Sequence, residues 1–118
     1  MGFKLVVADV VVVPMKFTLK DGGTARRFDY TLQCRRLTST EWYDGVRDDA
    51  GRLQDAKIKA LMTDVTIGWK GQTLVADDST GEPAEFCTEA LDVMYQTPGV
   101  IDMAVENYLK ECAAKVKN

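Results

Sequence analysis

The sequence has 118 residues, a length that fits one domain with its own hydrophobic core. Apolar residues make up 46% of the chain and charged residues 28%, which is typical of globular rather than disordered proteins. The net charge of −3 gives no general attraction to nucleic acid or to an anionic membrane. Histidine is absent, so the commonest general base and metal ligand is missing. We expect a single domain over 1–118 that uses no cofactor and binds neither nucleic acid nor membrane.

The N-terminal segment MGFKLVVADVVVVPM is apolar enough to suggest a signal peptide. However, Asp9 interrupts the apolar run, no small-residue cleavage pattern follows, and the run is shorter than the ~20 residues that span a bilayer. We expect a strand in a soluble intracellular protein. LVVADVVVV either lengthens the first strand or forms a short third one, and we expect burial under helices rather than an exposed edge for self-association.

Residues 10–36 predict an antiparallel β-hairpin. Apolar and polar residues alternate on both sides of the segment KDGGTA, whose Asp and Gly residues tolerate the positive φ of a tight turn. One face of the hairpin should therefore be apolar. Its members are Val11, Val13, Met15, Phe17, Leu19, Phe28, Tyr30, Leu32 and Cys34.

Helical patterns occupy the remainder, about 38–117. Thr38 and Glu41 have the spacing of a capping box, which predicts a short helix that ends at RDDAG. A second helix from about Leu53 carries an apolar stripe, and Trp69 is its last core-facing residue or the first residue after it. The stripe consists of Ile58, Leu61, Met62, Val65 and Trp69.

Two more helices are expected near the C-terminus. The first is capped near Thr88, with Glu89 at its positive end, and the second uses Thr97 as its cap and Pro98 as its first residue. The last helix should bury Ile101, Ala104, Val105, Tyr108, Leu109, Cys112 and Val116. Its outer face has the i to i+4 pairs Glu106–Lys110 and Glu111–Lys115. The order predicts an α+β fold, an N-terminal hairpin packed on about four C-terminal helices.

The sequence does not predict a calcium site, a zinc site or a catalytic site. Aligning Gly81 with the glycine of an EF-hand loop puts Ala76 and Thr80 where oxygen ligands are needed, so the acidic connector predicts a solvated turn. The three cysteines lack C-x-x-C spacing, which predicts buried reduced thiols rather than disulfides or zinc. No nucleophile motif or phosphate-binding loop is present, so we expect no catalysis.

The segment ARRFDYTLQCRR interleaves arginine with aromatic residues, as single-strand nucleic-acid platforms do. Phe28 and Tyr30 share their face with Leu32 and Cys34, which is the face that most simply forms the core. A small nucleic-acid-binding domain is therefore the less favoured alternative.

The order of several segments resembles the tail assembly chaperones of long-tailed bacteriophages and prophages. The resemblance runs from about Val12 to the last residue and rests on VPMKFTLKDGGTARRFDYTLQCRRL, DVTIGWKG, GEPAEF, EALDVMYQTPGV and YLKECAAKVKN. It implies a non-catalytic protein that binds the tape measure protein and keeps it soluble while the tail tube protein polymerises. It also implies weak homo-oligomers, a location in the cytoplasm of the bacterial host, and absence from the mature virion. A structural tail or head–tail joining protein retained in the virion is the alternative.

The resemblance makes 68–86 the connector between the middle and C-terminal helices. It suggests Trp69, Phe86 and Tyr108 as structural anchors and leaves the partner-binding residues unknown. It also implies a longer form, made when ribosomes slip back one base near the stop codon and add a second domain after Lys117 or Asn118. The ending KVKN permits a slippery G AAA AAC, although solubility explains a terminal Lys-Asn equally well.

Overall fold

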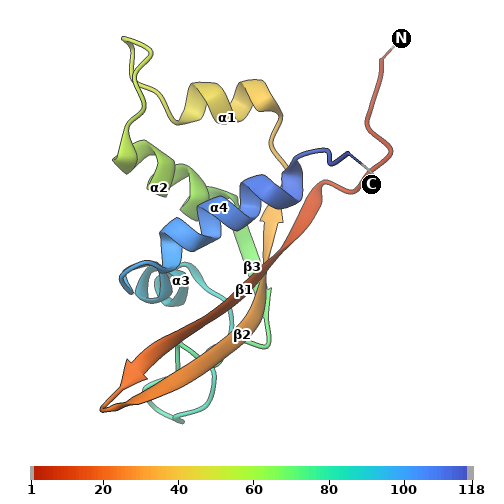
Figure 1. Ribbon diagram of the computed structural model, residues 1–118. Coiled ribbons are helices and arrows are strands. Elements are labelled where there is room, and N and C mark those ends of the chain that lie inside the picture. The colour runs from red at the N-terminus through yellow and green to blue at the C-terminus, as the bar shows by residue number, and fades with distance from the viewer. Residues whose placement is uncertain (1, 117–118) are drawn as a thin grey trace.

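The computed structural model describes residues 2–116 as an α+β fold (Figure 1). An antiparallel sheet has the order β1-β2-β3, with β1 (Val10–Asp21), β2 (Thr24–Arg35) and β3 (Thr66–Lys70). The helices are α1 (Ser39–Gly45), α2 (Asp55–Val65), α3 (Thr88–Tyr95) and α4 (Val100–Cys112). The helices gather over one end of the sheet, α4 crosses β1, and the tip of the hairpin extends away from them (Figure 1).

The predicted hairpin is confirmed. β1 and β2 pair along their whole length, with Val13 opposite Leu32, and Gly22 adopts a φ of 64° in the turn. The apolar face predicted from the alternation packs against the helices. Its buried members form one cluster with side chains of α2, α3 and α4. The most buried residues of this cluster are Val13, Met15, Leu32, Cys34, Met62, Val65, Leu91, Met94, Val100, Ala104 and Tyr108.

The expected strand within the N-terminal apolar run is confirmed from Val10 onward and is wrong for the residues before it. β1 begins only at Val10, whose partner Arg35 is the last residue of β2, so the residues before it have no strand to pair with. The expected burial of LVVADVVVV holds only for Val11 and Val13, and the other residues of this segment are exposed. The side-chain alternation of the strand turns Val10 and Val12 to the face opposite the helices.

The third strand lies in the segment expected to be helical. α2 ends at Val65, and Trp69 lies on β3 opposite Leu32 rather than on or directly after the helix. Thr66 and Ile67 are β-branched and favour extended backbone. Gly68 brings β3 close to β2, since an added Cβ would lie 2.7 Å from Oε1 of Gln33. Pairing with β2 therefore overrides the helical periodicity.

The helix ends differ in part from expectation. The capping box of Thr38 and Glu41 is confirmed, with both hydrogen bonds formed. The cap of α3 lies near Thr88 as expected and is Cys87, whose Sγ accepts a hydrogen bond from the amide of Ala90. The cap of α4 is Gly99, whose φ of 84° turns the chain after Pro98, so α4 begins two residues later than expected.

The C-terminal end of α4 lies earlier in the sequence than expected. The helix ends at Cys112, before Lys115, so only the Glu106–Lys110 pair forms an ion pair, with 3.0 Å between Oε1 and Nζ. Val116 and Leu109 are exposed, in contrast to their expected burial, because the first lies beyond the helix and the second faces solvent. Lys117 and Asn118, on which the frameshift prediction depends, lie outside the described residues.

Two carboxylates that accept backbone hydrogen bonds are expected to make unfolding pH-dependent. The amide of Thr38 lowers the pKa of Glu41 from its usual 4.5, and the amide of Arg52 lowers the pKa of Asp48 from 3.8. A folded pKa below the unfolded one gives stabilisation that is present above the unfolded value and lost as pH falls through the folded value. We expect the urea midpoint to be constant down to about pH 5 and to fall below it.

Glu41→Gln is the matched control for this pH dependence. Glutamine also completes a capping box, so the cap should persist without a titrating group. The variant should lose less stability than the parent between about pH 5 and pH 3. A urea midpoint that rises over this interval in the parent protein would contradict the assignment.

Candidate functional site: an apolar groove between α1 and α4

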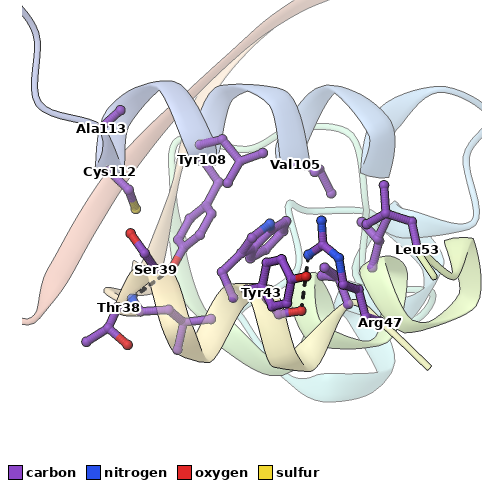
Figure 2. A pocket seen from close by; sticks show the side chains of 14 residues that line it. Thr38, Ser39, Tyr43, Arg47, Leu53, Val105, Tyr108, Cys112 and Ala113 are labelled. Carbon is purple, nitrogen blue, oxygen red and sulfur yellow. Dashed lines mark hydrogen bonds between the residues drawn. The ribbon is translucent and has the colours of Figure 1, made fainter. Parts of the chain in front are cut away.

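A groove of about 530 Å³ lies between α1, α4 and the loop that leads into α2 (Figure 2). We call it the α1–α4 groove. Its apolar lining comes from Leu37, Trp42, Val46, Val105, Leu109 and Cys112, among others. Of the 14 residues that line it, only Arg47 carries a charge at neutral pH. Its volume falls within the range of roughly 300–1,000 Å³ that is typical of ligand pockets.

The groove stays open because α1 covers its neighbours incompletely. α1 has only seven residues and buries none of them fully. Its Trp42 is half-buried, with a ring centroid 5.8 Å from that of Tyr108, while Tyr43 remains exposed. On the opposite wall Leu109 keeps 40% of its surface exposed. The apolar sides of α1 and α4 thus face a shared space instead of closing on each other.

Tyr108, one of the suggested anchors, forms part of this groove and ties it to the sheet. Its side chain is 1% exposed. The hydroxyl donates to the carbonyl oxygen of Arg35 at 2.7 Å and accepts from the amide of Leu37 at 3.1 Å (Figure 2 shows the latter). Burial raises the pKa of Tyr108, so the hydroxyl remains protonated and able to donate. The residue therefore fixes α4 against the end of β2, where α1 begins.

Arg47 lies toward one end of the groove, between Tyr43 and Leu53 (Figure 2). Its guanidinium carbon lies 3.6 Å from the centroid of the Tyr43 ring, a cation–π contact, and Nη1 donates to the Tyr43 carbonyl oxygen at 3.3 Å. Within residues 2–116 it forms no ion pair with a carboxylate. The C-terminal end of α4 lies at the other end, beside Cys112 and Ala113 (Figure 2). The groove therefore has a cationic end and an end with the partial negative charge of helix carbonyls.

Trp69 on β3 and Phe86 at the end of the connector, the other suggested anchors, contact each other away from this groove. Their rings meet edge to face with centroids 5.1 Å apart, and Nε1 of Trp69 donates to the carbonyl oxygen of Ala84 at 3.2 Å. Both side chains are half-buried. The structure thus brings two of the three residues together and places Tyr108 in a separate site.

Sequence reasoning missed Gln72, which organises the connector. Its side chain is 3% exposed. Nε2 donates to the carbonyl oxygens of Val75 and Ala84 at 2.9 and 3.0 Å, and Oε1 accepts from the amide of Val75 at 2.8 Å. A glutamine in a loop is ordinarily exposed, so its position in the sequence gave no signal of this role.

The acidic part of the connector forms a turn. Oδ1 of Asp77 accepts from the amides of Ser79 and Thr80 at 2.8 and 3.3 Å, and the amide of Gly81 donates to the Asp77 carbonyl oxygen. The Ser79 hydroxyl and these amides lower the pKa of Asp77. Among residues 2–116 no cluster of three or more His, Cys, Asp or Glu could hold a metal ion.

The cysteines are free, but their expected burial holds only for Cys34. Burial raises the pKa of the Cys34 thiol to about 11, so it is not a thiolate near neutral pH. Cys87 is exposed because it caps α3, and Cys112 is half-buried because it lines the groove. Cys112 is therefore a native reporter for groove occupancy.

The aromatic residues of the arginine-rich strand face inwards. Phe28 and Tyr30 are 5% and 3% exposed and belong to the core, so their faces are not available for stacking on bases.

In the stretch from Gly2 to Val116, no helix is long and apolar enough to cross a membrane.

Comparison with protein-family models, with curated proteins and with solved structures found no match.

Proposed function

We propose that this chain is a binding protein that holds apolar helical segments of a partner in the α1–α4 groove. The observation that carries this proposal is the apolar lining of the groove, in which Arg47 is the one charged side chain among 14 residues. Such a groove suits the apolar stripe of an amphipathic helix, which presents side chains at i, i+3, i+4 and i+7. An apolar surface without directional polar groups tolerates varied sequences, as a protein that keeps a long partner soluble requires.

More particularly, the chain is a tail assembly chaperone of a long-tailed phage or prophage. Its partner is the tape measure protein, which it keeps soluble in the cytoplasm of the bacterial host while the tail tube protein assembles. The segments that resemble this family support the proposal. They include QCRRL, which leads into the groove, and YLKECAAKVKN, which contributes Tyr108, Leu109 and Cys112 to it.

Co-expression tests this function. The tape measure protein of the same phage is produced alone, with the parent chain, or with the variant Leu109→Asp, and its soluble fraction is measured. We expect the parent chain to raise the soluble fraction several-fold and Leu109→Asp to lose this effect, because a carboxylate in the groove must be desolvated when the partner binds. Val93→Asp, at an exposed apolar site on α3, is the matched control and should act like the parent.

If the parent chain and Leu109→Asp raised the soluble fraction of the tape measure protein equally, the groove would not be the binding site. If the tape measure protein aggregated equally with and without the parent chain, the chain would not be its chaperone. Mass spectrometry of purified virions distinguishes the chaperone from the structural alternative. An assembly chaperone is absent from mature particles, whereas a joining protein is present in them.

A further inference from the structure

The N-terminal segment Phe3–Ala8, which we call the arm, is apolar apart from Lys4, and none of its side chains joins the hydrophobic core described for residues 2–116. Phe3 and Val6 are 96% and 98% exposed, and Leu5 is 70% exposed. Exposed apolar side chains in a continuous run usually mark a surface that another chain covers. The arm extends away from the helices (Figure 1).

The root of the arm is held in place. The amide of Arg36 donates to the Asp9 carbonyl oxygen at 2.6 Å, and Nε of Arg36 donates to the Ala8 carbonyl oxygen at 3.2 Å. These bonds continue the direction of β1 past the last residue pair of the hairpin. The arm is therefore presented outwards, while the groove of the same chain is left unfilled.

The arm and the α1–α4 groove complement each other in polarity, charge and length. The arm has the cation Lys4 near its start and the anion Asp9 directly after it, with apolar residues between them. The groove has Arg47 at one end and the carbonyl end of α4 at the other (Figure 2). Lys4 and Asp9 are about 16 Å apart in extended chain, and α4 runs about 12 Å from Val105 to Ala113, a difference that long side chains can cover.

We propose that the arm of one copy docks in the α1–α4 groove of a second copy, with Asp9 toward Arg47 and Lys4 toward the C-terminal end of α4. The apolar groove of one copy is then covered by the arm of another copy before a partner arrives, and the partner displaces that arm. This last step rests on the proposed function. The docking of the arm does not rest on the proposed function, because it involves copies of this chain alone.

Sedimentation of the purified chain over a range of concentrations tests the docking. The parent should self-associate reversibly below about 1 mM, and Val6→Asp should weaken the association at least about tenfold, because it removes an apolar contact and adds a charge to be desolvated. Val6 is 98% exposed, so the variant leaves the fold intact. Val116→Asp, at a site 89% exposed outside the arm, should match the parent. A monomeric parent, or a Val6→Asp variant that associates like the parent, overturns the proposal.

Cross-linking identifies the occupant of the groove. Val6→Cys is combined with Cys87→Ser, which leaves Cys112 in the groove and Cys34 in the core. Under mild oxidation we expect a disulfide between Cys112 of one copy and position 6 of another, seen as a covalent dimer that disappears when Cys112→Ser is added. A link within one chain, which leaves the protein monomeric, would show that the arm fills its own groove and would overturn docking between copies.

The two proposals can fail separately. Val6→Asp changes only the arm, so it should still raise the solubility of the tape measure protein in co-expression. Leu109→Asp changes the groove and should impair both self-association and solubilisation. Self-association that survives Leu109→Asp would contradict docking in the groove, whatever the outcome with the tape measure protein.

Discussion

Tyr108→Ala is expected to lower the free energy of unfolding by about 3–5 kcal/mol, as other large-to-small substitutions in protein cores do. The ring is fully buried against Trp42 and the sheet, so its removal leaves a cavity. The hydroxyl also satisfies the amide of Leu37 and the carbonyl of Arg35, where β2 gives way to α1. Urea denaturation of the parent and the variant measures the difference.

Tyr108→Phe separates the contribution of the buried ring from that of the hydroxyl hydrogen bonds. It keeps the ring and removes both hydrogen bonds, so we expect a loss of about 1–3 kcal/mol. Tyr43→Ala is the matched control, because this tyrosine is 54% exposed and its truncation should cost less than about 1 kcal/mol. A Tyr108→Ala variant as stable as Tyr43→Ala would show that α4 is not held to the sheet through this residue.

Gln72→Leu is expected to cost about 2–3 kcal/mol although leucine has a similar size and is more apolar. The Val75 amide would lose its acceptor inside the connector. The carbonyl oxygens of Val75 and Ala84 would each lose one donor and keep another, from the Ala84 amide and the Trp69 indole. The penalty therefore comes mainly from one buried, unsatisfied N–H. Urea denaturation gives its size, and limited proteolysis should show faster cleavage in 73–85.

Gln96→Leu provides the comparison. Gln96 is exposed and bonds only to Asp92 through its side chain, so the same chemical change there should stay within about 0.5 kcal/mol. If both glutamine variants retained parental stability, the connector would not depend on the Gln72 hydrogen bonds.

The hairpin was predictable because its signals are local. Alternation from Val11 to Leu19 and from Phe28 to Cys34 sets the buried face, and the Gly22 turn sets the register. The capping box at Thr38 is local in the same sense, since its two partners lie three residues apart. These features need no knowledge of the remaining chain.

β3 was missed because its identity depends on a distant strand. Trp69 lies four residues after Val65, so it continues the helical period of α2, and only pairing with Leu32 makes the segment extended. The β-branched pair Thr66–Ile67 and the glycine that follows it, Gly68, were the local signals against a longer helix. Gln72 was missed for a similar reason, because its partners are defined by how the connector folds back on itself.

The α1–α4 groove was beyond prediction from the sequence. Its walls come from segments around 37–47 and 105–113, and its openness depends on how far α1 stands from α4. Periodicity indicated that Leu109 and Val105 are core residues, whereas the first is exposed and the second half-buried on the groove. An apolar position that faces a groove has the same sequence pattern as one that faces a core.

The two tryptophans of the chain allow the central claim to be measured directly. Trp42 lines the groove, and the indole N–H of Trp69 is bonded to Ala84 in the connector. The indole N–H NMR signals of isotopically labelled Val6→Asp protein, in which the arm is not expected to dock, are followed while a purified helical segment of the tape measure protein is added. We predict that the Trp42 signal shifts or broadens with saturation and that the Trp69 signal stays in place. Binding that moves Trp69 and leaves Trp42 unchanged would contradict the groove as the site of action.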